Sequence, residues 1–327
     1  MVKIWFSILL ILVFEKANSQ SRTGITGRPD TSYTNHSAYL GSEKQYPDIR
    51  LVEEFHLPSI SEKKDIIYCV QGNRSLMLDA FCPSDKSKKK RTAILIIHGG
   101  GWRSGNRTQH YPLAQQLANL GYVCFTPEYR LSTEALYPAA VNDIKASIRW
   151  VHNHAKEYGI DSSRITVLGF SAGGELAAFM GSTNGISKFE GNENCESNYS
   201  SWVHAIIDID GILAFIHPES GEGNDSKGIS AATHWFGYSK VENPELWKEA
   251  GSLTHAGKQN PPTLFINSSV ARMHTGRSDY INILNKFGAY TEVHEFEDSP
   301  HSFCLFDPWF QPTVKYIDGF LKKVFDK

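Results

Sequence analysis

The stretch Ile165-Thr166-Val167-Leu168-Gly169-Phe170-Ser171-Ala172-Gly173-Gly174 sets one hydroxyl among residues that have almost no side chain. A short apolar run of the kind found in strands comes before the serine, and an apolar helical pattern follows it. Gly169 to Gly173 therefore match the pattern G-x-S-x-G at a strand-to-helix corner, where a serine nucleophile is held exposed. The alternative interpretation is a tight turn that needs only small residues.

A second glycine motif follows another apolar run. Residues 93–97 are continuously apolar, as expected for a strand that is buried on both faces. They lead into His98-Gly99-Gly100-Gly101-Trp102, a loop of the type that offers backbone N–H groups to a developing oxyanion. We predict that Gly100 and Gly101 donate from this loop and that Ala172 donates from the position after the nucleophile. The alternative interpretation is a plain flexible loop. It does not explain why two such glycine motifs each follow a predicted strand.

Strands and helices alternate along the chain. The apolar patterns predict strands over 66–71, 75–81, 93–98, 122–126, 165–168, 203–209, 263–266 and 292–296, and helices over 111–120, 138–155, 171–180 and from 312 onward. Such alternation predicts the α/β class, with a mostly parallel twisted sheet that carries helices on both faces. In sheets of this kind the chemistry gathers at the carboxyl ends of the strands.

His301 is the predicted general base. It follows the strand expected over 292–296, precedes the last helix and comes after the nucleophile in the chain, which is the order expected for a triad on such a sheet. A neutral imidazole can take the proton of Ser171 and return it to the leaving group. We interpret His98 as part of the loop architecture.

The acid of this triad has no obvious position. Its usual place after a late strand is occupied by residues 267–272, which contain no carboxylate. We favour Asp279, the first carboxylate downstream, whose other explanation is a first-turn charge that complements a helix dipole. Asp210, at the end of the preceding strand, is the main alternative, and Asp208 and Glu219 also remain open.

Composition and charge limit the possible classes of partner. The chain has 327 residues, 41% hydrophobic and 21% charged, with a formal net charge of −2. This balance gives no indication of a nucleic-acid partner or of a charged membrane surface. We find no metal or cofactor motif, and serine ester chemistry needs neither. The five cysteines are scattered; one or two disulfides are possible, and their pairing and the oligomeric state are left open.

The amino-terminal residues predict export. A basic start, an apolar run from Ile4 to Phe14 and the small residues before Gln20 are typical of a secretory signal peptide over 1–19. The run is short for a membrane span, so an uncleaved membrane anchor is the less favoured alternative. We expect a secreted or periplasmic protein that has no membrane partner after cleavage. Residues 20–45 are expected to form a flexible leader, and 46–327 a single catalytic domain.

The motifs resemble those of the α/β-hydrolase esterases over most of the chain. Within that superfamily the sequence is similar to the hormone-sensitive-lipase and acetylxylan-esterase side. The matching segments are His98 to Trp102, Pro138 to Asp143, Arg149-Trp150, Gly169 to Gly174, and His301. The resemblance implies an α/β-hydrolase fold and a serine esterase activity.

The last third of the chain resembles a narrower group. Phe265 to Asp279, Ser299 to Phe303 and Asp307 to Phe310 are similar to segments of exported α/β-hydrolases that act on plant pectin. The resemblance implies a carbohydrate esterase whose substrate is a polysaccharide or oligosaccharide, and the displaced acid fits this group. We predict a pectin methylesterase, with an acetylesterase on pectin or xylan as the alternative. A serine peptidase of the same fold and a non-catalytic binding protein are further hypotheses.

Two residues are predicted to bind substrate. Arg272 lies with His274 and Arg277 in a loop expected to border the site, and a guanidinium can hold a neighbouring uronate bidentately. The alternative is that these charges are solvated or pair with nearby acids. Trp102 is predicted to stack on a sugar ring. The insertions over 184–201 and 217–227 are polar, which suits a hydrophilic substrate.

Overall fold

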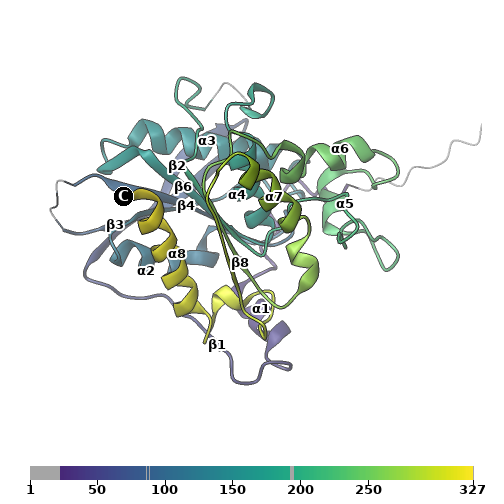
Figure 1. Cartoon of the computed structure of the whole chain (residues 1–327), viewed down its shortest axis with the longest axis horizontal. Coiled ribbons are helices and arrows are strands. Elements are labelled where there is room, and N and C mark those ends of the chain that lie inside the picture. Colours follow the sequence, from purple (N-terminus) through teal and green to yellow (C-terminus); the bar gives the residue numbers. More distant parts are fainter. Residues whose placement is uncertain (1–22, 86, 88, 192–194, 327) are drawn as a thin grey trace, which may run out of the picture.

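The computed structural model describes residues 23–85, 87, 89–191 and 195–326 (Figure 1). Its strands are β1 Arg50–Leu51, β2 Ile60–Gln71, β3 Arg74–Pro83, β4 Arg91–Ile97, β5 Val123–Pro127, β6 Ile160–Phe170, β7 Ala205–Ile209, β8 Thr263–Asn267, β9 Thr291–Glu295 and β10 Phe306–Asp307. Its α-helices are α1 Asn35–Ser42, α2 Tyr111–Asn119, α3 Ala139–His154, α4 Ala172–Ser182, α5 Ala231–Phe236, α6 Pro244–Glu249, α7 Arg277–Lys286 and α8 Phe310–Phe325.

Eight of the strands form one sheet. Their order is β2-β3-β5-β4-β6-β7-β8-β9, and every pair from β5 to β9 is parallel, whereas β2-β3 and β3-β5 are antiparallel. The short strands β1 and β10 pair separately. Because the parallel strands all end at one edge, the loops that follow β4, β6, β7 and β8 meet there.

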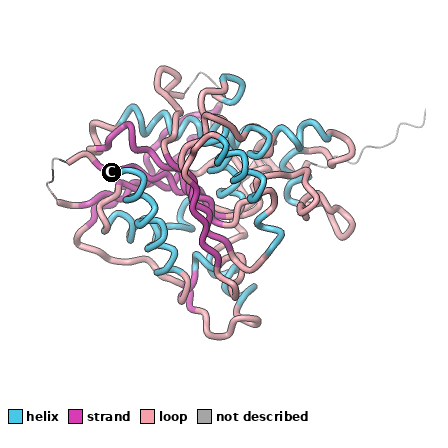
Figure 2. The backbone as a smooth tube through the Cα atoms, in the orientation of Figure 1, coloured by secondary structure: helices cyan, strands magenta, loops and turns pink. Residues whose placement is uncertain are grey.

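Helices cover both faces of the sheet (Figures 1 and 2). One buried cluster packs α3 and α4 against the sheet, and the other packs α2 and α8 against the opposite face. The spacing of the apolar residues explains the α3 contact, since Val141, Ile144, Ile148 and Val151 are all at most 1% exposed. The predicted α/β class, with a mostly parallel sheet between two layers of helices, is confirmed.

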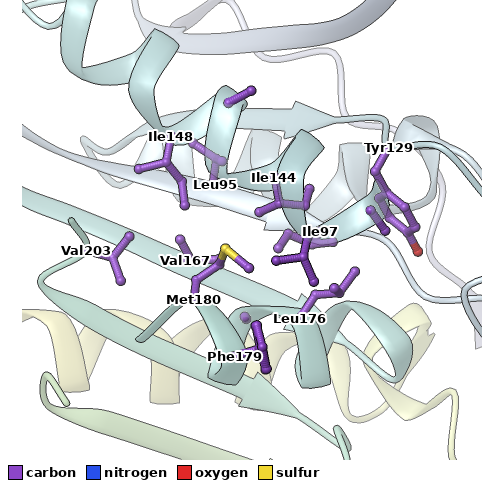
Figure 3. Close-up of a cluster of buried hydrophobic side chains, with 14 of the residues drawn as sticks. Leu95, Ile97, Tyr129, Ile144, Ile148, Val167, Leu176, Phe179, Met180 and Val203 are labelled. Carbon is purple, nitrogen blue, oxygen red and sulfur yellow. The ribbon is translucent and has the colours of Figure 1, made fainter. Parts of the chain in front are cut away.

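The core beside α4 fixes the helix that follows the G-x-S-x-G motif. Figure 3 shows Leu176, Phe179 and Met180 of α4 facing Ile97 and Val167 of the sheet. These side chains are fully buried or nearly so. Each such side chain contributes about 1.5–3 kcal/mol when it is buried. The amino-terminal end of α4 is therefore held firmly over the carboxyl ends of β4 and β6.

The element predictions hold for the large sheet and for the long helices, with small shifts at most ends, but β2 begins at Ile60 and not at the predicted residue 66. The strand predicted over 165–168 begins earlier, at Ile160. The helices α5, α6 and α7, like α1, have no counterpart among the predicted elements, because their segments are short or largely polar. In Figure 1 α5 and α6 lie to the right of the sheet, whereas α7 packs against β8 through Tyr280 and Leu284.

The amino-terminal segment differs from the prediction. The predicted signal peptide over 1–19 lies outside the described residues. From residue 23 the chain packs on the domain, which contradicts the expected flexible leader in its described part, residues 23–45; residues 20–22 lie outside the described residues. The backbone N–H groups of Thr26 and Gly27 donate to the Thr133 carbonyl at 2.8 and 2.9 Å. A capping box at Thr34 starts α1, and Ala38 is buried.

A disulfide bond joins Cys69 to Cys195, which are 126 residues apart in the chain. It ties β2 to the insertion between α4 and β7. Within the described part of the chain, Cys82, Cys124 and Cys304 are free thiols. No helix among the described residues is both long enough and apolar enough to cross a membrane.

Candidate active site

Ser171 sits at a strained corner between β6 and α4. Its φ is +56°, a conformation that non-glycine residues rarely adopt. The glycines of the motif allow the strand and helix to come this close. A Cβ at Gly169 would lie 1.9 Å from the Gly173 carbonyl oxygen, and one at Gly173 would lie 2.2 Å from the Ile97 carbonyl oxygen. The backbone of Ser171 donates to the Ile209 carbonyl at 2.8 Å, which anchors the corner to β7.

The second glycine motif lies beside the serine. Gly100 and Gly101 have φ angles of +124° and +61°, and a Cβ at Gly100 would lie 1.9 Å from the Ser104 carbonyl oxygen. The amide of Gly99 donates to Gln109 Oε1 at 2.7 Å, which fixes the start of the loop. Gly100, Gly101 and Ala172 line the same cavity as Ser171. The N–H of Ala172 lies at the start of α4, where amides have no intrahelical partner.

His301 joins the serine to an acid. Its Nε2 lies 2.9 Å from Ser171 Oγ, and its Nδ1 lies 2.9 Å from Asp210 Oδ2. The carboxylate accepts a hydrogen bond from the Nδ1–H group, so Nε2 is left as the acceptor for the serine hydroxyl. The structure therefore brings the predicted nucleophile and base together in the arrangement of a Ser–His–Asp triad.

Asp210 is fully buried at the end of β7. Its Oδ1 accepts hydrogen bonds from the Ser268 amide at 2.7 Å and from Asn267 Nδ2 at 3.3 Å, and its Oδ2 also accepts from the Ser268 hydroxyl. The segment after β8, which lacks a carboxylate of its own, thus supplies donors to the carboxylate on β7. These bonds leave Asp210 oriented toward the imidazole.

The choice of Asp279 as the acid is wrong in this geometry. Asp279 lies in the first turn of α7, its side chain is 62% exposed, and its carboxylate lies 3.2 Å from His217 Nε2. Its position matches the alternative explanation, a first-turn charge that complements the helix dipole. Of the other carboxylates, Asp208 is buried and accepts from the Gly211 amide, and Glu219 accepts from the Gly276 amide. Neither reaches His301.

His98 belongs to the architecture of the glycine loop, as interpreted from the sequence. Its ring stacks on Tyr129, with centroids 4.4 Å apart, and its Nδ1 lies 2.8 Å from the Gly99 carbonyl oxygen. Burial lowers the pKa of His98 to about 4, and burial together with His98 lowers the pKa of His110 to about 3. Both imidazoles are neutral at physiological pH.

Ser171 lines a cavity of about 290 Å³. Beside the serine, the histidine and the glycine loop, the wall is partly apolar and partly charged. Its further lining residues are Tyr33, Trp102, Ser104, Ile212, Glu222, Ala231, Arg272 and Met273. The cavity is large enough for a small acyl or alkyl group and an adjoining ring.

The structure contradicts the prediction that Trp102 stacks on a sugar. Trp102 borders the cavity but is only 4% exposed. Its indole is stacked on Trp235, with centroids 4.8 Å apart and 6° between the planes, and Phe215 lies 5.4 Å away. The faces of the ring are therefore packed in the core. The indole Nε1 donates to Glu175 Oε2 at 3.1 Å.

The three basic residues that follow β8 have separate positions. Arg272 lines the cavity and lies 3.5 Å from Glu222, so its prediction as a substrate contact stays a prediction. Arg277 donates to Asn267 Oδ1 and pairs with Glu295, neither of which lines the cavity. His274 Nε2 lies 2.8 Å from the Ser268 carbonyl oxygen, where it supports the segment that holds Asp210.

Tyr33 and Glu222 are two of the cavity residues that were not anticipated from the sequence. Tyr33 reaches the site from the amino-terminal segment, and its hydroxyl lies 3.3 Å from the Ser302 hydroxyl. Glu222 comes from the insertion between β7 and α5, and burial raises its pKa while Arg272 opposes this rise. The polar character of both segments was visible in the sequence, but nothing there indicated that they fold over the nucleophile.

This sheet, the serine corner at the end of β6 and the histidine after β9 define an α/β-hydrolase with a serine nucleophile. A family model described as BD-FAE matches residues 78–273, more than half of the chain. The chain belongs to this family, whose members are α/β-hydrolase esterases. The match includes both glycine motifs and Asp210.

Known esterases are similar in sequence and in structure. Esterase LipQ of Mycobacterium tuberculosis (strain ATCC 25618 / H37Rv) is 30% identical over 257 residues, which is 76% of this chain and 59% of that protein. The chain thus spans about three fifths of this relative. Thermogutta terrifontis esterase 2 phosphoramylated by tabun aligns with TM-score 0.67 and 26% identity, covering 83% of this chain and 97% of the other. A truncated carbohydrate esterase from gut microbiota has TM-score 0.69 and 22% identity, covering 83% and 100%, and supports the fold alone.

Substituting the two candidate acids separates their roles. Asp210→Asn removes the charge that holds the Nδ1 proton of His301, so we expect kcat on a nitrophenyl ester to fall by about 10⁴-fold, as in other triads. Asp279→Asn is the matched control, and we expect its kcat to stay within about twofold of the wild type. The reverse ranking in steady-state assays would contradict the assignment of Asp210.

Acid is expected to destabilise the fold through the two buried histidines. Their pKa values are lowered to about 4 and about 3 from 6.5, so the unfolded chain binds more protons below pH 6.5. The contribution of each histidine to the free energy of unfolding is therefore fully present above pH 6.5. It is lost as the pH falls toward 4, by on the order of 3 kcal/mol per group.

Urea unfolding across pH 4–7 measures this slope. His110→Leu removes one of the two groups and is expected to flatten it. His56→Gln, at an exposed histidine, serves as the control. An unchanged slope in His110→Leu would show that His110 does not titrate as described.

Proposed function

We propose that this protein is a serine carboxylic ester hydrolase that acts on an esterified carbohydrate, with the methyl esters of pectin as the first candidate substrate. The observation that carries the hydrolase assignment is the hydrogen-bonded series Ser171–His301–Asp210, with both contacts at 2.9 Å. Membership of an esterase family and likeness to named esterases support the reaction type.

The geometry suggests the sequence of proton transfers. Ser171 Oγ attacks the ester carbonyl while His301 Nε2 accepts its proton, and buried Asp210 stabilises the imidazolium. The tetrahedral oxyanion is stabilised by the amides of Gly100, Gly101 and Ala172, each of which typically contributes about 2.7–4 kcal/mol to the transition state. His301 returns the proton to the leaving alkoxide. Water then hydrolyses the acyl-enzyme by the same route.

The position of Arg272 supports the methyl esters of pectin as the substrate. It is the cation in the cavity lining, and its side chain is 55% exposed, so it can reach a bound chain. In pectin the acyl group would be the galacturonate itself, methanol would leave first, and a neighbouring free uronate would pair with the guanidinium. For this role the Arg272 guanidinium has to leave its ion pair with Glu222 and pair with the substrate carboxylate instead.

Glu222 favours a second candidate, an acetyl ester on a neutral sugar. Its carboxyl is largely buried in the cavity wall near Arg272, and it would repel a uronate while accepting hydrogen bonds from sugar hydroxyl groups. The small apolar part of the cavity around Ile212 and Met273 would then take the acetyl methyl group. In this reaction the sugar alcohol leaves first and acetate last.

We also propose that the protein acts outside the cytoplasm. The Cys69–Cys195 disulfide supports this localisation, because such bonds persist in oxidising compartments. The signal-like residues 1–19 agree with it, and a polysaccharide substrate would be met there.

Product analysis distinguishes the two substrates. Wild type, Ser171→Ala, Arg272→Gln and Glu222→Gln are incubated with methylated pectin and acetylated xylan, and methanol and acetate are quantified. For the pectin assignment we expect methanol release, no product above background from Ser171→Ala, and a KM on pectin raised several-fold in Arg272→Gln. Nitrophenyl acetate is the control ester, on which Arg272→Gln should match the wild type.

Acetate release alone, weakened in Glu222→Gln, would move the assignment to the acetyl ester. Release of neither product, together with an inert Ser171 toward nitrophenyl esters, would contradict the hydrolase proposal itself.

A further inference from the structure

Glu175 is a buried carboxyl that the proposed reaction does not use. It lies on α4 one turn after the nucleophile, and its backbone N–H donates to the Ser171 carbonyl at 3.0 Å. Its side chain is 0% exposed. A carboxyl placed among apolar side chains costs free energy unless its hydrogen bonds compensate, so its contacts need an explanation.

The carboxyl reaches the loop that offers the oxyanion amides. Glu175 Oε2 accepts the hydrogen bond from Trp102 Nε1 at 3.1 Å. Trp102 directly follows Gly101 and has a φ of +56°, an unfavourable angle for a residue with a side chain. Since the indole is also stacked on Trp235, the side chain of Trp102 is held at its polar end and on its face. The strained backbone beside Gly101 is thereby fixed.

The backbone of the same tryptophan has its own anchor. Its carbonyl accepts from the Ser132 amide at 2.7 Å, and the loop closes on itself where the Arg103 and Ser104 amides donate to the Gly100 carbonyl. The indole bond to Glu175 differs from these contacts, because it connects the loop to the helix turn that carries Ser171.

The protonation state of Glu175 fits this role. Burial raises the pKa of Glu175 well above its usual value, and the nearby Asp208 raises it further. Burial therefore favours the neutral acid, in which the oxygen that faces the indole still accepts its hydrogen bond. Its second oxygen, Oε1, has no hydrogen-bond partner among the described residues. A glutamine side chain is uncharged and has the same shape, so it should accept the same hydrogen bond from the indole.

We infer that Glu175 is a positioning residue, which holds the Gly100 and Gly101 amides in register with Ser171 through its hydrogen bond to the Trp102 indole. The role in catalysis rests on the proposed function; the mechanical coupling between α4 and the loop does not. The effect belongs to the transition state, because the donors act on charge that develops there.

Three variants test the inference. Glu175→Gln keeps the acceptor oxygen, Glu175→Met removes it at similar volume, and Trp102→Phe removes the donor. On nitrophenyl acetate we expect Glu175→Met to lose at least 30-fold in kcat with KM within about threefold, and Glu175→Gln to stay within about threefold in both. Glu175→Met/Trp102→Phe should be no worse than the poorer single variant, since both remove one bond. Ser182→Ala, at the far end of α4, is the control.

Amide hydrogen exchange measured by NMR gives a readout that does not depend on turnover. In Glu175→Met the amides of Arg103, Ser104 and Ser132, which donate to carbonyls of this loop, should exchange at least tenfold faster than in the wild type, and in Glu175→Gln they should not. Circular dichroism confirms that each variant is folded. Unchanged exchange and unchanged kcat in Glu175→Met would overturn the inference, as would equal losses in Glu175→Met and Glu175→Gln. A wild type inert toward every ester, with faster exchange in Glu175→Met, would refute the proposed function and leave the coupling standing.

Discussion

The contact between the carboxyl end of β6 and the first turn of α4 is the constraint on which the site depends. Ser171 takes a φ of +56° there, and the flanking glycines let backbone carbonyls approach to distances that no Cβ would permit. This strain has to be compensated by the packing around it. The buried face of α4 against β4 and β6 supplies that packing, so the core and the reactive hydroxyl are parts of one arrangement (Figure 3).

The parallel sheet then decides which side chains can meet the hydroxyl. Strands β6, β7 and β8 are adjacent, so Asp210 at the end of β7 is beside the serine corner and within reach of the Ser268 donors after β8. His301 arrives from the loop after β9 and bridges the two. A fully buried carboxylate with several donors stays oriented, and it fixes the tautomer of the imidazole.

The sequence was sufficient for features that depend on local pattern. The glycines around Ser171 and Gly100, the apolar runs and the place of His301 after a strand all carry local signals. Asp210 and Asp279 carry no local signal that tells them apart, because both come after a predicted strand, and only the packing of the sheet shows which one meets His301. Likewise, nothing local shows that Trp235 covers Trp102, or that Tyr33 folds back to Ser302 from a polar segment. These contacts are long-range and follow from packing.

The most direct measurement of the central claim is the site and rate of covalent phosphorylation by paraoxon, an organophosphate that reacts with an activated serine hydroxyl. Peptide mass spectrometry should find a single adduct on Ser171, and the rate of its formation should fall by orders of magnitude in His301→Ala while the fold is retained. An adduct at any other residue, or an undiminished rate in His301→Ala, would contradict the claim that the strained corner presents Ser171 to this imidazole.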